Sequence, residues 1–398
     1  MAIFKKKKKI PLTAREYVFL RNVLLIAITA FGGPQAHMAM FFKVFVDKQR
    51  YLTKEELLEL YSLCQILPGP TSTQTITAIG FRKGGAKLAY LTILLWSLPA
   101  VIFMTVLGIL VNYLAEAGFS KDFTRYIRPM AVSFVAFAAF RMLKVLQTHL
   151  AMGLAAVAII LGLLISSPYL FPVVLISAGI IAGIVRKFPH EPLKPFKVEW
   201  DNLFLYGAVF IGSALLGWIT KSLPIRLFEN FYRNGSLVFG GGHVLAPMLF
   251  TEFVEFKRYL TAHEFMTGYS IVQSLPGPLF SFAAYIGALS MREYGIVGEV
   301  IGAVMSSLGI FLPGTFLIFF FIRFWDELKK YSKVRASLEG ITAAGAGFVV
   351  SAAFHLFVSI DWNIANLSIV IIVFVGQFFE KIPSVLFVLI GIIAGFIF

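Results

Sequence analysis

The chain has 398 residues, of which 58% are hydrophobic and only 14% are charged, and its mean hydropathy is +0.83. Because a soluble domain carries about 25% charged residues, this composition excludes a soluble globular protein and indicates an integral membrane protein. The net charge of +14 is expected to mark cytoplasmic loops, not a nucleic-acid-binding surface. The single cysteine, Cys64, excludes an intrachain disulfide and a cysteine-cluster metal site.

Apolar segments near the roughly 20 residues of a membrane-spanning helix follow one another along the chain. A basic tail at 1–14 is expected to be cytoplasmic. The expected spans of the first half are 17–32, 60–80, 88–113, 128–147, 150–166 and 171–186. A basic loop and an extra span at 203–220 precede the expected spans 225–240, 268–288, 297–323, 341–359, 364–379 and 382–397. The sequence therefore predicts an all-α polytopic membrane protein with about 13 spans.

The two halves of the chain repeat one sequence pattern. Residues 31–70 align without a gap on 239–278, displaced by 208 positions, with 19 identities in 40. Because a single extra span separates the copies, they are expected to have opposite orientations in the membrane. The expected organisation is a tail at 1–14, a first repeat at 15–187, a basic loop and linking helix at 188–222, and an inverted second repeat at 223–398.

Loop charges predict a cytoplasmic amino terminus, because basic residues concentrate on the cytoplasmic side. One loop is an exception. The 43–59 loop is expected outside although it carries Lys43, Lys48, Arg50 and Lys54. The segments 60–80 and 268–288 each have a Pro-Gly-Pro near the start, and each could be a re-entrant hairpin instead of a full span.

Pro-Gly-Pro cannot lie inside a continuous helix, because each proline removes a donor and restricts the residue before it. In lipid such a break is tolerated only where it is buried in protein or lines a cavity. A helix that starts after the break offers unpaired N–H groups at the positive end of its dipole, which suits an oxyanion. The Phe-Gly-Gly segments supply an opposing break. Alternatively, these glycines and prolines only permit close packing or kinks.

The candidate substrate-binding residues come from both copies, but the polar run after the break belongs to the first copy alone. The first copy is therefore expected to make more ligand contacts, and the second to act as gate or scaffold. The first-copy candidates are Gly32, Gly33, His37, Gln65, Pro68, Gly69, Pro70, Thr71, Ser72, Thr73, Gln74 and Arg82. The second-copy candidates are Gly240, Gly241, His243, Gln273, Pro276, Gly277, Pro278 and Ser281.

Several charged and titratable side chains have two interpretations. The histidines of the two copies are not aligned, and each either carries a coupling proton or hydrogen-bonds a broken helix. Arg82 either captures an anion at the inner mouth or is a topology charge. Arg21 and Arg233 lie within expected spans, where charge is costly, and should face a cavity or a partner such as Glu229. The sequence has no zinc-protease, phosphate-loop or Asp-rich diphosphate motif, so no enzyme activity, metal or cofactor is expected.

These motifs resemble those of the chromate ion transporter family in its long, two-domain form, over roughly 15–398. The resemblance rests on the segments 31–40, 64–74, 79–80, 239–248 and 273–278. The sequence departs from the family pattern in the weakly polar stretch after Pro278 and in Tyr51, where the family often has tryptophan.

The resemblance implies a multi-pass carrier of the inner (plasma) membrane that exports chromate, a tetrahedral dianion shaped like sulfate, using the membrane potential or the proton gradient. The expected partners are chromate or a sulfate-like oxyanion and the lipid bilayer, with no nucleic acid, and a homodimer is compatible with the sequence. One alternative is a carrier or channel for uptake of sulfate or a related anion. A membrane-embedded lipid-phosphate transferase is another, and the lack of acidic metal ligands argues against it.

Overall fold

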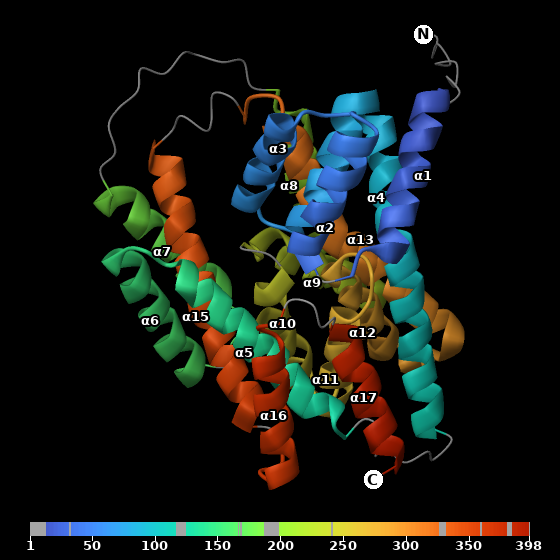
Figure 1. Ribbon diagram of the computed structural model, residues 1–398, viewed down its shortest axis with the longest axis vertical. Coiled ribbons are helices and arrows are strands. Elements are labelled where there is room, and N and C mark those ends of the chain that lie inside the picture. Colours follow the sequence, from blue (N-terminus) through green and yellow to red (C-terminus); the bar gives the residue numbers. More distant parts are fainter. Residues whose placement is uncertain are drawn as a thin grey trace.

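The structure is a computed structural model that describes residues 13–31, 33–116, 125–165, 167, 169–186, 199–239, 242–325, 332–358, 360–379 and 384–397. Every regular element in these ranges is a helix (Figure 1). The first half contains α1 (Ala14–Thr29), α2 (Gly33–Phe41), the π-helix η1 (Phe42–Lys48), α3 (Lys54–Ile66), α4 (Thr71–Glu116), α5 (Ile127–Val145), α6 (His149–Leu164) and α7 (Leu170–Val185).

The linking helix α8 (Asp201–Thr220) leads into the second half. That half contains α9 (Leu223–Leu237), α10 (Gly242–Phe250), the π-helix η3 (Thr251–Phe256), α11 (Ala262–Gln273), the 3-10 turns η4 (Leu279–Ser281) and η5 (Arg292–Tyr294) around α12 (Phe282–Ser290), α13 (Gly295–Phe321), α15 (Ser332–Val358), α16 (Ile364–Gly376) and α17 (Ser384–Ile397).

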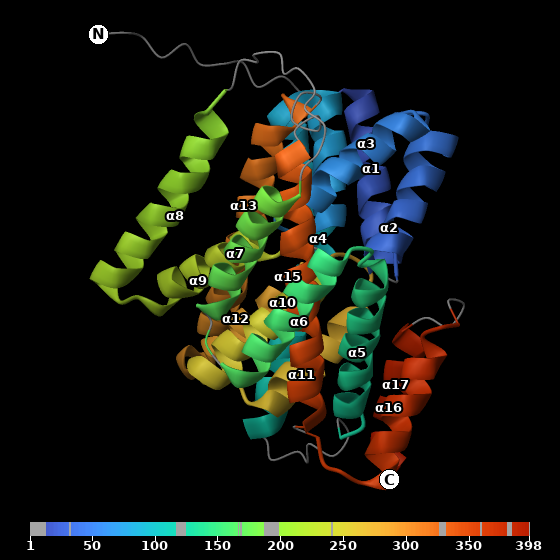
Figure 2. The same ribbon diagram turned by 90° about the vertical axis from the view of Figure 1, so that its left-hand side faces the viewer.

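Four helices of the described part are long and apolar enough to cross a membrane, and they cover Thr71–Leu114, Asp201–Thr220, Arg292–Phe321 and Ala336–Val358. Shorter apolar helices accompany them. The helix α8 lies at the edge of the molecule (Figure 2) and exposes large apolar side chains such as Phe204 and Trp218, as expected of a lipid-facing surface. These features indicate a polytopic membrane protein, and the count of about 13 spans stays a prediction.

Two expected spans are interrupted and a third is shorter than predicted. The expected spans 60–80 and 268–288 are not continuous helices, because α3 ends at Ile66 before α4 begins at Thr71, and α11 ends at Gln273 before η4 begins at Leu279. The expected span 17–32 is also shorter than predicted, since α1 ends at Thr29 and α2 begins at Gly33. The breaks fall at the Pro-Gly-Pro and Phe-Gly-Gly motifs, where the missing N–H groups and flexible glycines disfavour a helix.

The first half folds back on itself at its Phe-Gly-Gly break. The ring of Phe19, near the start of α1, lies 5.4 Å from that of Phe45 within η1 and 5.7 Å from that of Tyr51 beyond the end of η1. Residues 14–48 therefore form a hairpin and not a single crossing. The segment after η1 lies at the same end of the molecule as the start of α1, near the top of Figure 1. This differs from the expectation that 43–59 and the amino terminus lie on opposite sides.

The second half contains an equivalent hairpin. Phe231 of α9 stacks on Phe253 of η3 at 4.8 Å, and Arg292 Nη1 donates to Glu264 Oε1 at 2.8 Å. The long helix α13 then runs back to the opposite end, where Phe319 lies 4.9 Å from Phe81. In Figure 1, α11 and α12 accordingly lie well below α3.

Local backbone conformations are duplicated along with the sequence. Gly69 and Gly277 have φ of 119° and 101°, and Arg50 and Arg258 have φ of 50° and 54°. Matching capping boxes start α3 and α11. The kinks before the long helices match as well, with φ of 67° at Gly85 and 66° at Gly295. These positive φ values favour glycine, which explains why glycine recurs at both breaks and both kinks.

The two halves interleave in the packed core. The helix α15 packs against α5, α6 and α7, and α4 packs against α12 and α13 (Figure 2). Small residues permit the close approach. A Cβ added to Gly347 of α15 would lie only 2.3 Å from the carbonyl oxygen of Ala155. The breaks of both halves are thereby held in the interior of the molecule.

Candidate functional site

The breaks of the two copies are joined to each other by reciprocal hydrogen bonds. The Gly69 N–H donates to the Val238 carbonyl at 2.7 Å, and the Gly277 N–H donates to the Ala30 carbonyl at 3.3 Å. Val238 and Ala30 directly precede the two Phe-Gly-Gly motifs. Each Pro-Gly-Pro break therefore contacts the end of the first helix of the other copy. The sequence did not indicate this exchange between the halves.

The first part of α4, which ends at the kink of Gly84 and Gly85, begins at the first-copy break. Pro70 is followed by Thr71, the first residue of α4, and residues 71–75 are all buried. The first N–H groups of an α-helix have no partner within the helix, and they lie at the positive end of its dipole. The start of α4 is therefore a buried cluster of donors without a formal charge, as the sequence predicted for the break.

Two of the predicted hydroxyls are engaged by aromatic side chains. His37 Nδ1 lies 3.0 Å from Ser72 Oγ, and its ring meets Trp96 edge-on at 5.0 Å. Trp96 Nε1 in turn donates to Thr73 Oγ1 at 3.0 Å. His37 is 1% exposed, and its Nε2 has no hydrogen-bond partner among the described residues. The sequence did not identify Trp96 as a site residue, although tryptophan inside an apolar span is a usable signal.

Gln74 holds the backbone of the break. Its Nε2 donates to the carbonyl of Pro68 at 2.8 Å and to that of Gly314 in α13 at 3.3 Å. Its Oε1 is buried and has no partner in the described part of the chain. Because the amide hydrogens serve two carbonyls, Gln74 positions the break more than it offers donors to a ligand. Gly314 was not predicted, and the Leu-Pro pair before it, Leu312-Pro313, was the available signal.

The second-copy break is less polar. Pro278 precedes the short turn η4, and Ser281 in that turn is fully buried, with no partner for its Oγ in the described structure. Gln273 Nε2 donates to the Tyr269 hydroxyl of its own helix at 2.7 Å. Pro276 and Gly277 are half-buried. This break therefore offers donors from its backbone more than from its side chains.

Other candidates lie apart from the breaks or outside the description. Arg82 follows Thr71 by about 16 Å along α4, and its Nη2 pairs with Glu59 Oε2 at 3.8 Å. Gln65 is exposed. Gly33 begins α2, whereas Gly32, Gly240 and Gly241 lie outside the described residues, as does the side chain of His243.

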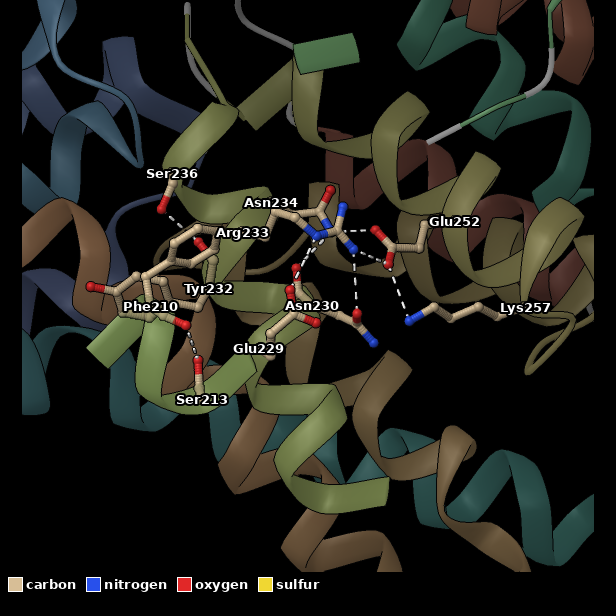
Figure 3. Close-up of polar contacts among 10 residues, drawn as sticks. All are labelled: Phe210, Ser213, Glu229, Asn230, Tyr232, Arg233, Asn234, Ser236, Glu252 and Lys257. Atoms are coloured by element: carbon tan, nitrogen blue, oxygen red, sulfur yellow. Dashed lines mark hydrogen bonds and ion pairs between the residues drawn. The ribbon is translucent and has the colours of Figure 1, made fainter. Parts of the chain in front are cut away.

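The two arginines of the expected spans differ in environment. Arg21 is exposed. Arg233 pairs with Glu229 at 3.2 Å, the partner that the sequence suggested, and also with Glu252 at 2.6 Å (Figure 3). Glu252 was missed because its segment was interpreted as the beginning of a loop.

The arrangement is suited to an anion that is recognised by shape. Helix-start N–H groups could donate hydrogen bonds to such an anion, as could the Ser72 hydroxyl where His37 Nδ1 donates to it, and these groups carry no full charge. Donors arranged in this way would distinguish anions by the directions of their oxygens.

Comparison with known proteins gives consistent relatives over most of the chain. The model of the chromate transporter family matches residues 18–184 and 225–396, one match in each half. An uncharacterized transporter of Methanocaldococcus jannaschii is 25% identical over 94% of this chain and 92% of its own length. A chromate transport protein of Pseudomonas aeruginosa is 23% identical over 84% of this chain and 79% of its own.

A probable chromate transport protein of Synechococcus elongatus is 22% identical over 94% of this chain and 93% of its own length. No solved structure matches the chain. The family is one of membrane transporters and not of enzymes. Because its model matches both halves, this chain belongs to the chromate transporter family.

Proposed function

We propose that this protein is a secondary transporter that exports chromate, or another tetrahedral oxyanion of sulfate's shape, across the plasma membrane. The observation that carries the proposal is the reciprocal pair of hydrogen bonds, Gly69 to Val238 and Gly277 to Ala30. It brings the buried helix start of the first copy, with its donors, against the second copy. The binding residues are the predicted ones of the first-copy break, with the hydrogen-bonded pair of His37 and Ser72 supplying one side-chain donor, and Trp96 and Gln74 as supports.

The same contacts support two inverted repeats, at 15–187 and 223–398, joined by the loop and linking helix at 188–222. The hairpin loop of the first copy lies near the start of α1, whereas that of the second lies near Arg292, at the other end of α13. Transporters built from inverted repeats with broken helices bind substrate where the repeats meet.

The charges of the first hairpin support a cytoplasmic amino terminus. The hairpin of the first copy brings Lys43, Lys48, Arg50 and Lys54 to the same end as Arg82 and the start of α1. The loop that contradicted the positive-inside rule as a single crossing then obeys it, whereas Lys257 and Arg258, which a single crossing would place inside, move to the other end, where Lys257 pairs with Glu252.

The membrane potential is a sufficient energy source for outward movement of a dianion. Moving one charge across 100 mV is worth about 2.3 kcal/mol, so a dianion leaving a negative interior gains about 4.6 kcal/mol. A carrier without a coupling ion can therefore export chromate. A proton gradient is needed as an energy source only if chromate flux persists when no membrane potential is imposed.

The decisive experiment is chromate flux in liposomes containing the purified protein, with membrane potential and pH gradient imposed separately. We expect efflux from the negative compartment that rises with the potential and falls when excess sulfate is added. Net movement of sulfate into the negative compartment, driven by a proton gradient, would favour the uptake carrier instead. Absence of any anion flux would contradict the proposal.

A further inference from the structure

Four charged side chains form a closed cluster between α9 and η3 (Figure 3). Glu252 of η3 is 1% exposed, and its Oε1 receives Arg233 Nη2 at 2.6 Å and Lys257 Nζ at 3.2 Å. Its Oε2 receives Asn234 Nδ2 at 2.6 Å. Glu229 pairs with the other side of the Arg233 guanidinium. Two carboxylates and two cations make the cluster neutral, so a single substitution leaves a buried charge without its partner.

The cluster exists in one copy only. The positions 208 residues before Arg233, Asn234, Glu252 and Lys257 are Leu25, Ile26, Val44 and Gln49. The first copy thus builds the same hairpin and the same π-helix without these ion pairs, with Arg21 in the place of Glu229, so the fold does not require the cluster. Buried ion pairs contribute little net stability compared with apolar packing, but a satisfied polar network fixes one arrangement. The charges therefore need a role other than folding.

A continuous series of hydrogen bonds leads from the cluster to the first-copy break. The Asn234 carbonyl receives the Val238 N–H at 3.1 Å, and the Val238 carbonyl receives the Gly69 N–H at 2.7 Å. The adjacent Pro68 carbonyl is held by Gln74. On the other side of α9, a Cβ added to Gly235 would lie 2.8 Å from the Ile310 carbonyl of α13. The end of α9 is therefore fixed by close packing on one side and by the charged cluster on the other.

We propose that Glu252, Arg233, Asn234 and Lys257 are positioning residues that form a latch, which holds the Val238 carbonyl against Gly69 and so keeps the first-copy anion site closed. This inference rests on the proposed function, because it assigns a role toward the same site. The equivalent contact of the second break, Gly277 to Ala30, is longer at 3.3 Å and has no such cluster behind it. The contact between Gly277 and Ala30, which no such cluster holds, is consequently the one that opens first.

The latch can be tested without measuring transport. In a Cys64→Ala background, Thr71→Cys reports on the first break, and Leu279→Cys, 208 positions later, reports on the second. Labelling by a membrane-permeant maleimide should be slower at position 71 than at 279. Glu252→Gln should accelerate labelling at 71 by roughly tenfold or more, since it removes hydrogen bonds to a charged acceptor. It should leave labelling at 279 unchanged.

Matched variants distinguish release of the latch from a general loosening of the folded protein. Glu255→Gln changes a carboxylate of the same π-helix outside the cluster, and should leave both labelling rates unchanged. The double variant Glu252→Gln/Lys257→Gln restores neutrality, and should return the rate at 71 toward that of the parent. If Glu252→Gln does not fold, Lys257→Gln removes the weaker contact and should accelerate labelling at 71 to a lesser degree.

An unchanged rate at position 71 in the cluster variants would overturn the latch, as would an equal rise at both reporters. Because labelling requires no substrate, these outcomes are independent of chromate flux. A protein that shows the latch but moves no anion would refute the proposed function alone. In an active protein, release of the latch should raise the KM for chromate more than it changes the maximal rate.

Discussion

At the scale of single residues, the site divides into groups that face a ligand and groups that hold the backbone. Under the proposed function, Ser72, His37 and the first N–H groups of α4 belong to the first class, because they lie together at the start of α4 and His37 Nε2 has no hydrogen-bond partner among the described residues. Gln74, Trp96 and Gly314 belong to the second, because each bonds another part of the break. This division yields separate expectations for affinity and for stability.

Ser72→Ala should weaken the binding of all tetrahedral oxyanions together. The loss of one neutral hydrogen bond is worth about 0.5–1.5 kcal/mol, so apparent affinity should fall roughly 2- to 10-fold. Competition of sulfate, molybdate and selenate with chromate measures this, and nitrate, a planar monoanion, should compete poorly in parent and variant alike. Ser62→Ala is the control, because Ser62 is exposed and bonds only the Leu58 carbonyl in the described structure. A loss confined to chromate would contradict recognition by shape.

Gln74→Leu should reduce stability as well as transport. It leaves the carbonyl of Pro68 without the Gln74 donor, at about 1–3 kcal/mol for a buried unsatisfied group, and removes the additional contact to Gly314. The thermal unfolding midpoint in detergent should fall measurably. The exposed Gln65→Leu should change the free energy of unfolding by no more than about 0.5 kcal/mol. Equal midpoints for the two variants would assign Gln74 to ligand binding instead.

At the scale of elements, the proposed function assigns more of the transport activity to the breaks than to the helices that they separate. Pro68→Ala and Pro276→Ala should preserve membrane insertion but reduce flux, because a repaired helix removes the exposed N–H groups. The first-copy variant should lose about tenfold or more, equivalent to one hydrogen bond to a charged group, and the second-copy variant less. Pro172→Ala in the first turn of α7, away from the breaks, is the control. Full flux in both break variants would show that the motifs serve only to pack the helices.

The element limits could largely be predicted, and the pairing of elements could not. Apolar segments at 128–147 and 203–220 correspond to α5 and α8 within a few residues, because hydropathy reports directly on length. The segment 17–32 was predicted as a crossing because hydropathy carries no information on the direction in which the chain continues. A chain that reverses after Gly-Gly has the same composition as one that continues as a helix. The bond from Gly69 to Val238 depends on that reversal, so the exchange between halves was not predictable.

The same limit explains the residues that were missed. Glu252 and Lys257 are charged and follow an apolar segment, which is the pattern of a loop, and only the return of η3 onto α9 places them in a buried cluster. Trp96 lies in the expected span 88–113, and only the fold brings it to Thr73. Motifs duplicated at a fixed offset were therefore the part of the site that sequence could reveal.

At the scale of the whole molecule, the two hairpins determine which segments share a side of the membrane. Phe19 packs on Tyr51, and Arg82 pairs with Glu59, so the first hairpin loop, the kink of α4 and the amino terminus should share one side. In the second copy, Glu264 pairs with Arg292, and α13 separates this end from the first. The loops near residues 48 and 256 should therefore lie on opposite sides.

A matched pair of cysteines tests this arrangement. Lys48 and Phe256 occupy equivalent positions 208 residues apart, and both are exposed. In a Cys64→Ala background, an impermeant maleimide applied to intact cells should label Phe256→Cys and not Lys48→Cys. Inverted membrane vesicles should reverse the result. The basic residues around Lys48 support this orientation, since positive charge accumulates in the cytoplasm. Labelling of both cysteines from one side would contradict inverted copies. In that case the two break contacts could not open toward opposite sides of the membrane.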